Sequence, residues 1–268
     1  MTANTHITAA EVETYNRDGW VIPAGFRLDE AELTELRQAL DQVMTDNPDI
    51  MPDRLMNVHL NGGKPYGISG SKAFHDLAHD QRILDLAESV MGPDLVLLFS
   101  HMFCKPGKSA RTVPWHQDGP FWPVKPLASV TVWVALDKVE VANGAMKVIP
   151  GSHNGAFHNH EMLDDPNSTL NRTLSADDVD EAKAAYIELE PGQVSLHDIG
   201  LIHGSAANTS GHRRAGLALR YMPSTSHVYR VMPGSAAGWE DMPIELVRGQ
   251  NHHEGNDYSL GNFGQPWA

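Results

Sequence analysis

Residues 129–137 read SVTVWVALD, and this stretch decides the fold. Branched apolar side chains occupy every second position, and a different set of side chains fills the positions between them. The first set is Val130, Val132, Val134 and Leu136, and the second set is Thr131, Trp133 and Ala135. Side chains two residues apart lie on the same face of a strand, so this period of two indicates a β-strand with two different faces.

Similar short runs recur through the middle of the chain, after Gly92. They are rich in β-branched and apolar residues, and Gly, Pro and Asn separate them. The clearest are DLVLLFSHMFC (94–104), AMKVIPGSH (145–153), GQVSLHD (192–198) and RRAGLALRYMP (213–223). Strands spaced in this way, without regular helices between them, favour an antiparallel sandwich or barrel.

The first ninety residues are predicted to be mainly helical. Thr8, with Glu11 three residues later, is the capping-box pattern of a helix start. Asp29 is the expected N-cap of a second helix, because leucine and valine recur at helical spacing after it. A third periodic run ends at Gly92.

These patterns predict one domain over residues 1–268. We expect a helical N-terminal layer at about 8–92, a β core at about 93–230 and a C-terminal tail at 231–268. The segment from about 157 to 185 is polar and is expected to form a loop or lid.

Composition and charge exclude several classes of function. The formal net charge is −14, which disfavours binding to nucleic acid or to anionic membranes. The single cysteine, Cys104, excludes an intrachain disulfide. The N-terminus lacks the pattern of a secretory leader, and no run reaches the roughly 18 apolar residues that a membrane span needs. We therefore expect a soluble, cytoplasmic protein that acts on a small molecule, and its oligomeric state stays open.

Residues 113–123, VPWHQDGPFWP, set His116 and Asp118 two positions apart in a stiff, aromatic segment. On an extended segment both side chains would point the same way, so one metal ion could contact both. The alternative is a histidine in a turn beside a surface aspartate, because the pair His-x-Asp often arises by chance.

A second histidine, His203, ends the strand-like run VSLHDIGLIH, and Arg214 follows eleven residues later. Two histidines and one carboxylate from different strands form the facial triad of non-haem Fe(II) oxygenases, which leaves one face of the iron open. Two of the open positions suit the keto-acid end of 2-oxoglutarate, and the third suits O2. We expect Arg214 on the strand next to His203, binding the far carboxylate of 2-oxoglutarate, with Ser205 adding a hydroxyl.

In combination, these motifs resemble the phytanoyl-CoA dioxygenase family, which also includes ectoine hydroxylases and many bacterial small-molecule hydroxylases. The resemblance runs from about Tyr15 to Tyr221 and is carried by WHQD (115–118), VWVALD (132–137), NGAMKVIPGSH (143–153) and HGSAANTSGHRR (203–214). It implies a mainly β fold with flanking helices, whose core is a double-stranded β-helix (a cupin-like jelly roll). It also implies hydroxylation of a C–H bond of a small organic substrate. Fe(II) would be the bound metal, 2-oxoglutarate and O2 the cosubstrates, and succinate and CO2 the coproducts.

Carried over position by position, the resemblance implies the metal ligands His116, Asp118 and His203 and the cosubstrate contacts Arg214, Ser205, Trp133 and His101. Arg214 is counted with the catalytic residues. Lys72 matches a further family contact less well and is left unassigned. Because Asp118 retains the carboxylate that halogenases on this scaffold replace with a small residue, oxidation rather than halogenation is favoured.

Other assignments stay open at this point. Two rival functions are a cupin-type hydrolase or isomerase that uses Zn or Mn on the same ligands, and a non-catalytic ligand-binding β-barrel in which these residues are structural. The aromatics Trp115, Phe121 and Trp122 would either wall the metal from water or pack in the core. His197 and Asp198 are expected to have supporting roles. The histidines near His253 would either bind metal or be solvated.

Overall fold

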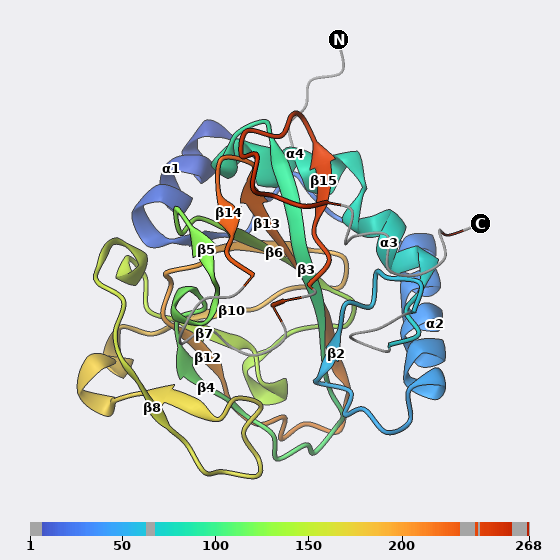
Figure 1. Cartoon of the computed structure of the whole chain (residues 1–268). Coiled ribbons are helices and arrows are strands. Elements are labelled where there is room, and N and C mark those ends of the chain that lie inside the picture. The colour runs from blue at the N-terminus through green and yellow to red at the C-terminus, as the bar shows by residue number, and fades with distance from the viewer. Residues whose placement is uncertain (1–6, 63–67, 231–238, 241, 259–266, 268) are drawn as a thin grey trace.

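Two antiparallel β-sheets form the centre of the computed structural model, which describes residues 7–62, 68–230, 239–240, 242–258 and 267 (Figure 1). The major sheet has the strand order β1 (Trp20–Val21), β11 (Val194–Asp198), β6 (Val130–Ala135), β13 (Arg214–Pro223), β3 (Leu95–Lys105) and β15 (Glu245–Arg248), and β2 (Leu55–Met56) also pairs with β3. The minor sheet has the order β10 (Ala185–Ile187), β7 (Met146–Val148), β12 (His203–Ser205) and β4 (Val113–His116).

Two further strand pairs lie outside these sheets. One joins β14 (His227–Val228) to β5 (Val124–Lys125), and the other joins β8 (His160–Met162) to β9 (Arg172–Leu174). The second pair belongs to the polar segment at 157–185, which also carries two short 3-10 turns, Ala176–Asp178 and Glu181–Lys183.

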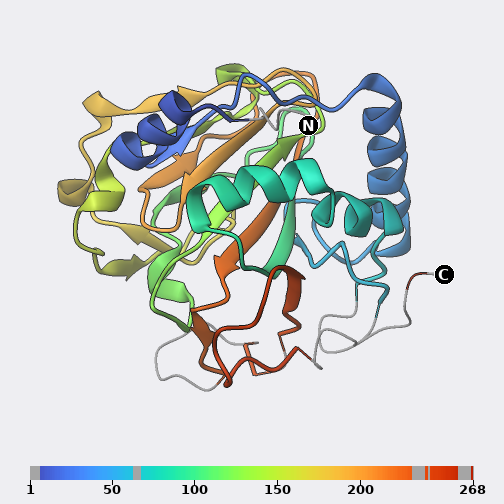
Figure 2. The ribbon, with the colours of Figure 1, turned by 90° about the horizontal axis from the view of Figure 1, so that it is seen from above.

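The helices begin where the sequence predicts. Helix α1 (Ala9–Asp18) starts at Thr8 and α2 (Glu30–Asp46) starts at Asp29, and each start has the full reciprocal capping box. Helices α3 (Lys72–Ala78) and α4 (Gln81–Met91) follow, and α4 ends at Gly92. All four lie on the outer side of the major sheet, and Figure 2 shows α4 crossing it, where it contacts β3, β6 and β13.

Strand β6 shows why the alternating stretch decides the architecture. Val130, Val132 and Val134 pack with the helices in the largest apolar cluster, whereas Trp133 and Ala135 pack on the opposite face, in a different cluster toward the minor sheet. Both faces of the strand are buried. The major sheet is therefore the middle layer between the helices and the minor sheet.

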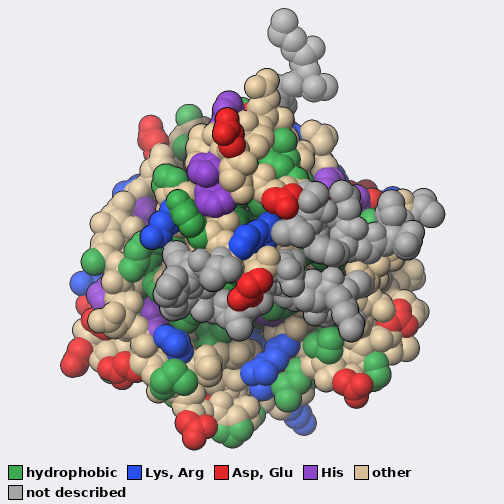
Figure 3. Space-filling view, viewed as in Figure 1, with side chains coloured by type: hydrophobic (Ala, Val, Ile, Leu, Met, Phe, Trp, Pro, Cys, Tyr) green, Lys and Arg blue, Asp and Glu red, His purple; other side chains and the backbone are tan. Residues whose placement is uncertain are grey.

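This arrangement confirms the predicted fold class: a mainly β protein with flanking helices around a double-stranded β-helix core. The chain passes from the minor sheet at β4 to the major sheet at β6, and from the minor sheet at β12 to the major sheet at β13. Such crossings place residues that are distant in sequence on facing sheets. On the face seen in Figure 3, acidic side chains lie mostly around the rim, with several basic side chains nearer the middle.

Within the described residues, no helix is long and apolar enough to cross a membrane. The division of the chain into a helical layer, a β core and a tail stays a prediction. Part of the predicted tail, β15, adds a strand to the edge of the major sheet beside β3, which the sequence did not suggest.

Candidate active site

The two predicted histidine ligands face each other across the minor sheet. His116 is the last residue of β4, His203 is the first residue of β12, and the two are direct partners in the strand register. Their rings lie 4.1 Å apart between centroids, and both side chains are buried. Strand pairing therefore fixes the separation of two imidazoles whose positions in the sequence are far apart.

Backbone carbonyls orient both rings. The Nδ1 of His116 lies 2.9 Å from the carbonyl oxygen of Pro114, and the Nδ1 of His203 lies 2.9 Å from that of Leu201. A carbonyl oxygen only accepts, so each Nδ1 carries a proton and donates it. Each Nε2 is then left with a lone pair, which is the form that binds a metal. Burial, the first cause, and the neighbouring His116 keep the pKa of His203 well below its usual range, so His203 stays neutral.

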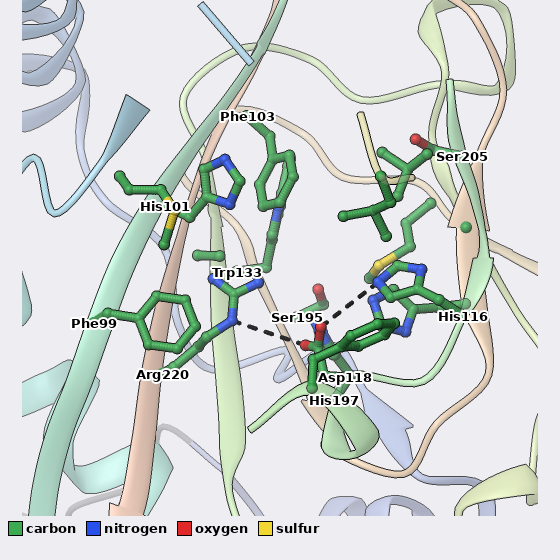
Figure 4. A pocket seen from close by; sticks show the side chains of 18 of the residues that line it. Phe99, His101, Phe103, His116, Asp118, Trp133, Ser195, His197, Ser205 and Arg220 are labelled. Carbon is green, nitrogen blue, oxygen red and sulfur yellow. Dashed lines mark ion pairs between the residues drawn. The ribbon is translucent and has the colours of Figure 1, made fainter. Parts of the chain in front are cut away.

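Asp118 completes the group, but not in the geometry expected from an extended segment. Strand β4 ends at His116, and Asp118 has helical backbone angles at the start of a 3-10 turn, Gly119–Phe121. The prediction of an extended pair was wrong because the chain turns immediately after His116. The turn still brings the Asp118 Oδ1 to 3.5 Å from the His116 Nε2 (Figure 4).

The electrostatic environment keeps Asp118 ionised. Burial by itself would raise the pKa of this carboxyl group. The nearby Arg220 guanidinium, together with His116 and His203, outweighs burial and holds the pKa of Asp118 far below its usual range. The carboxylate therefore carries a negative charge at any physiological pH, as a metal ligand must.

These three side chains form a donor set suited to ferrous iron. One ligand atom from each of His116, Asp118 and His203 lies within 4.8 Å of the others, and all three residues are buried. Two imidazoles and one carboxylate on one side of a site, with the other side facing a cavity, are typical of non-haem Fe(II). The Oδ2 of Asp118 is also buried with no hydrogen-bond partner among the described residues, which fits a carboxylate prepared for a cation.

A second group of possible ligands has a simpler explanation. His75, His79 and Glu245 also lie close together, but all three are partly exposed. Glu245 already pairs with His79 at 3.1 Å and with His59 at 3.6 Å, so the group joins β15 to the helical layer. His253, which the sequence left open, stacks on His227 at 4.4 Å and belongs to neither group.

A cavity of about 350 Å³ opens beside the three ligands. Its wall is mainly aromatic and aliphatic and comes from both sheets. The aromatic part consists of Phe99, Phe103, Phe121, Trp122, Trp133 and Trp239. Of the three aromatics near the metal ligands, Phe121 and Trp122 therefore line the cavity, whereas Trp115 packs elsewhere and donates from its Nε1 to Glu181.

Arg214 reaches this cavity from a different strand than the sequence suggested. It begins β13, which belongs to the major sheet and pairs with β3 and β6, not with the strand β12 that carries His203. The expectation of a neighbouring strand was wrong because the loop at 206–213 crosses from one sheet to the other. Arg214 nevertheless lines the cavity, facing the minor sheet.

The guanidinium of Arg214 is held with part of its donors unused. Its Nη2 donates to the carbonyl of Gly144 at 2.7 Å, and its guanidinium carbon lies 5.6 Å from the centroid of the Trp133 ring. Gly144 has φ +84°, a conformation that favours glycine. The Nε of Arg214 is buried without a hydrogen-bond partner among the described residues. Burial lowers the pKa of Arg214 to about 10, so it is a charged group that lacks an anion.

Ser205 and Lys105 lie next to this cation. The Nζ of Lys105 donates to the Ser205 Oγ at 2.8 Å and to the carbonyl of Ala206 at 2.6 Å. Because the Ser205 oxygen accepts from the lysine, its own O–H is free to donate into the cavity. Burial, with a smaller effect of Arg214, lowers the pKa of Lys105 to about 6.

The remaining predicted residues divide into two groups. Trp133 and His101 both line the cavity, and the His101 ring lies 3.8 Å from that of Phe103. Burial, the first cause, and Arg220 lower the pKa of His101 to about 3, so this ring is neutral. Lys72 lies on the exposed surface of α3, paired with Asp76, and does not line the cavity.

Two supporting residues have different positions. His197 lines the cavity beside His203, with 5.1 Å between ring centroids, and burial lowers its pKa to about 4. Asp198 instead accepts from the backbone of Gly200 and lies near the hydroxyl of Tyr15, so it stabilises the turn before β12.

Sequence reasoning missed Arg220, which also lines the cavity from β13. A signal was present. Arg214, Gly216, Ala218 and Arg220 alternate along one strand, and a period of two places all four side chains on the same face. The polar segment at 157–185 was also left without a role, and it contributes Leu170, Asn171 and Arg172 to the wall.

Comparison with known proteins agrees with this geometry. The family model "Phytanoyl-CoA dioxygenase (PhyH)" matches residues 15–216. A probable alpha-ketoglutarate-dependent hypophosphite dioxygenase of Stutzerimonas stutzeri is 30% identical over 151 residues, which are 56% of this chain and 52% of that protein. The chain spans about half the length of several curated relatives that it matches.

Solved structures show the same fold. The non-heme monooxygenase ThoJ superposes with a TM-score of 0.70 at 23% identity, covering 94% of this chain and 92% of that chain. The epimerase SnoN, solved with Fe3+, alpha ketoglutarate and nogalamycin RO, superposes with a TM-score of 0.67 at 21% identity, covering 85% of this chain and 91% of that chain. Since the family model covers most of the sequence and includes all three candidate metal ligands, the chain belongs to the phytanoyl-CoA dioxygenase family.

Proposed function

We propose that this protein is an Fe(II)- and 2-oxoglutarate-dependent dioxygenase that hydroxylates a C–H bond of a small organic substrate, with succinate and CO2 as coproducts. One observation carries the proposal. A buried 2-His-1-carboxylate set opens into the same cavity as a buried arginine whose Nε has no hydrogen-bond partner in the described part of the chain. A bound metal ion would account for the first feature, and an anion in the cavity would account for the second.

The minor sheet and the turn after β4 would hold the metal, and the major sheet would hold the cosubstrate. His116, Asp118 and His203 would hold the iron, and bound iron with 2-oxoglutarate and O2 would supply the oxidant for the C–H bond. Arg214 and the Ser205 hydroxyl would bind the far carboxylate of 2-oxoglutarate. Trp133, stacked beside Arg214, would keep that guanidinium in place.

Lys105 would act indirectly on the same carboxylate. By donating to the Ser205 oxygen, its Nζ turns the hydroxyl proton toward the cavity. Its burial also keeps water away from the anchor, where a charge-assisted hydrogen bond is strengthened by the low local dielectric.

Exclusion of water is the other task of the chain. Phe121, Trp122 and Trp239 surround the open side of the ligands with apolar surface. A reactive oxidant in contact with bulk water would be lost to side reactions, so a dry wall protects the reaction with substrate.

The rival functions differ from the proposed one in whether they need Arg214 or a metal. A cupin-type hydrolase or isomerase with Zn or Mn on the same ligands has no keto acid to anchor, and a ligand-binding barrel needs no metal. The epimerase SnoN has the same fold, so a reaction that leaves the oxygen content of the substrate unchanged is a variant of the proposed reaction. A product of unchanged oxygen content would identify that variant.

The test is succinate formation from 2-oxoglutarate with Fe(II) and O2, in wild type, Arg214→Gln and Arg213→Gln. Arg213 is the matched control because it pairs with Asp137 and Asp41 and lies outside the cavity. Removing one partner of a buried charge pair costs about 2–5 kcal/mol, which is roughly 30- to 4,000-fold in affinity. We expect Arg214→Gln to raise the KM for 2-oxoglutarate by that range and Arg213→Gln to leave it within threefold. Absence of succinate in the wild type, or equal KM values in the two variants, would overturn the proposal.

A further inference from the structure

Arg220 is a second buried cation in the cavity, and its one ion pair among the described residues is a long contact with Asp118, a proposed metal ligand. It lies on β13, opposite Phe99 of β3 and Thr131 of β6, and the strand register shifts between Arg220 and Tyr221. Such an irregularity re-aims a side chain. Only 5% of Arg220 is exposed, yet its Nε and Nη1 have no hydrogen-bond partner among the described residues.

The nearest anion does not satisfy this guanidinium. The Nε of Arg220 lies 3.8 Å from the Asp118 Oδ2, which is too long for a hydrogen bond (Figure 4). Asp118 is also committed to the metal site. The other neighbours are aromatic: the guanidinium carbon lies 4.6 Å from the Phe99 ring centroid, 5.5 Å from that of Trp122 and 6.0 Å from that of Phe103.

Stacking on rings does not replace the hydrogen bonds that a buried guanidinium loses. A cation–π contact stabilises a guanidinium less than the loss of its hydrogen bonds on burial destabilises it. A buried cation in a cavity whose Nε and Nη1 lack acceptors among the described residues indicates a ligand that supplies the missing acceptor.

Charge balance shows that the proposed cosubstrate does not supply it. Among the described residues that line the cavity, the charged side chains apart from histidine are Asp118, Arg172, Arg214 and Arg220. Ferrous iron, Asp118, Arg214 and the 2-oxoglutarate dianion together carry no net charge. Arg172 is exposed and screened by water. Arg220 is therefore the one buried charge in this lining that remains uncompensated.

The two arginines also lie in different parts of the cavity. They are six residues apart on the same face of β13, which separates their Cα atoms by roughly 20 Å. Arg214 lies beside Trp133, in one apolar cluster, and Arg220 lies beside Phe99 and Trp122, in another. Arg214 serves the cosubstrate end in the proposed function, so the part around Arg220 is left for substrate.

We propose that Arg220 binds an anionic group of the substrate, a carboxylate or another small oxyanion, while Phe99, Trp122 and Trp239 contact its apolar part. The inference rests on the proposed function, which places 2-oxoglutarate at Arg214. It narrows the substrate class from small organic molecules to small organic anions. A bidentate guanidinium contact would also fix the orientation of the substrate relative to the metal.

Binding can be measured without turnover. The protein is prepared without O2, with Mn(II) in place of Fe(II) and with N-oxalylglycine, an inert analogue of 2-oxoglutarate. Benzoate, butyrate and methylphosphonate are then titrated calorimetrically, and benzamide and butyramide serve as uncharged counterparts. Wild type is compared with Arg220→Gln, the conservative Arg220→Lys and the control Arg213→Gln, each checked for folding by circular dichroism.

In wild type we expect at least one acid to bind tenfold or more tightly than its amide. Arg220→Gln should remove this preference, Arg220→Lys should keep part of it, and Arg213→Gln should keep all of it. The affinity for N-oxalylglycine should change less than threefold in every variant. Acids that bind no better than amides in wild type would overturn the inference. So would an Arg220→Gln variant that weakens N-oxalylglycine binding but keeps the preference for acids, since Arg220 would then serve the cosubstrate. Failure of wild type to bind Mn(II) and N-oxalylglycine would instead count against the proposed function itself.

Discussion

Gly216 makes room for the indole of Trp133, and Gly216→Ala should displace that ring. Gly216 lies on the inner face of β13 between Arg214 and Ala218. A Cβ built at this position would lie 2.0 Å from the Trp133 Cζ2 and 2.1 Å from its Cη2. Carbon atoms in contact are about 3.5–4.0 Å apart, so the ring must move by about 1.5 Å or more.

The magnitude follows from what the ring contacts. Gly216 needs no left-handed backbone conformation, so the cost of alanine is steric rather than conformational. Overpacking a buried site costs about 1–3 kcal/mol. The displaced ring also loses its contact with Arg214, worth about 0.5–2 kcal/mol. We expect a loss of about 2 kcal/mol in the free energy of unfolding, equivalent to roughly 4–8 °C in Tm for a chain of this size.

Thermal and urea denaturation of four proteins tests the reasoning: wild type, Gly216→Ala, Trp133→Phe and the double variant. Phenylalanine is shorter than tryptophan, so Gly216→Ala should cost at least 1 kcal/mol less in the Trp133→Phe background. Gly211→Ala is the control, because a Cβ there meets no atom within 4 Å. If Gly216→Ala costs the same in both backgrounds, or no more than Gly211→Ala, the steric argument is wrong.

Three further predictions concern stability and metal. Asn208→Ala should lower the free energy of unfolding, measured by urea denaturation, by about 1–3 kcal/mol, because its buried side-chain amide donates to three backbone carbonyls. The control Asn154→Ala, at the surface, should cost under about 0.5 kcal/mol. The pair of Glu245 and His79 should stabilise the fold most between about pH 4.5 and 6.5. Burial opposes both charges, but the contacts outweigh it: His59 and His79 lower the pKa of Glu245 from its usual 4.5, and Glu245 raises that of His79 from its usual 6.5. The contribution of Glu245 is then present above pH 4.5 and falls as the pH drops through its folded pKa, and that of His79 is present below pH 6.5 and falls as the pH rises through its folded pKa. In melting curves from pH 3 to 9, a stability difference between wild type and Glu245→Gln that does not vary with pH would contradict this. Finally, Mn(II) at 100 times its Kd should add about 2.7 kcal/mol to the stability of wild type and nothing to Asp118→Ala, as measured by Tm with and without a chelator.

Local patterns predicted the elements of the fold well. The caps at Thr8 and Asp29 act within one helical turn, so sequence spacing contains nearly all the information needed to place them. The alternation in β6 likewise reports which side chains share a face. For the site, the chemistry of two histidines and a carboxylate indicated which residues would meet, and the structure brings His116, Asp118 and His203 together.

Features that depend on three-dimensional crossings were not predictable in the same way. Spacing suggested that Arg214 would neighbour His203, but nothing in the loop at 206–213 says that it crosses between sheets. In the sequence, Arg220 and Lys105 resemble ordinary charged residues, yet both are buried in the structure. Burial of a strand residue depends on the strands that pair on either side, and these come from distant parts of the chain. Strand β15 pairs with β3, whose residues lie about 150 positions earlier in the chain, and no local pattern in β3 indicates its edge partner.

The candidate metal ligands come from the minor sheet and the turn after β4, whereas the buried arginines of the cavity, Arg214 and Arg220, come from the major sheet, which has a consequence for motion. Anything that binds the ligands and an arginine at once connects the two layers. Opening of the sandwich then requires release of the bound molecules, so amide hydrogens of β4, β12 and β13 should exchange with solvent together, and more slowly, once the cavity is filled. The same opening equilibrium of the two sheets would then control both hydrogen exchange and the entry of small molecules.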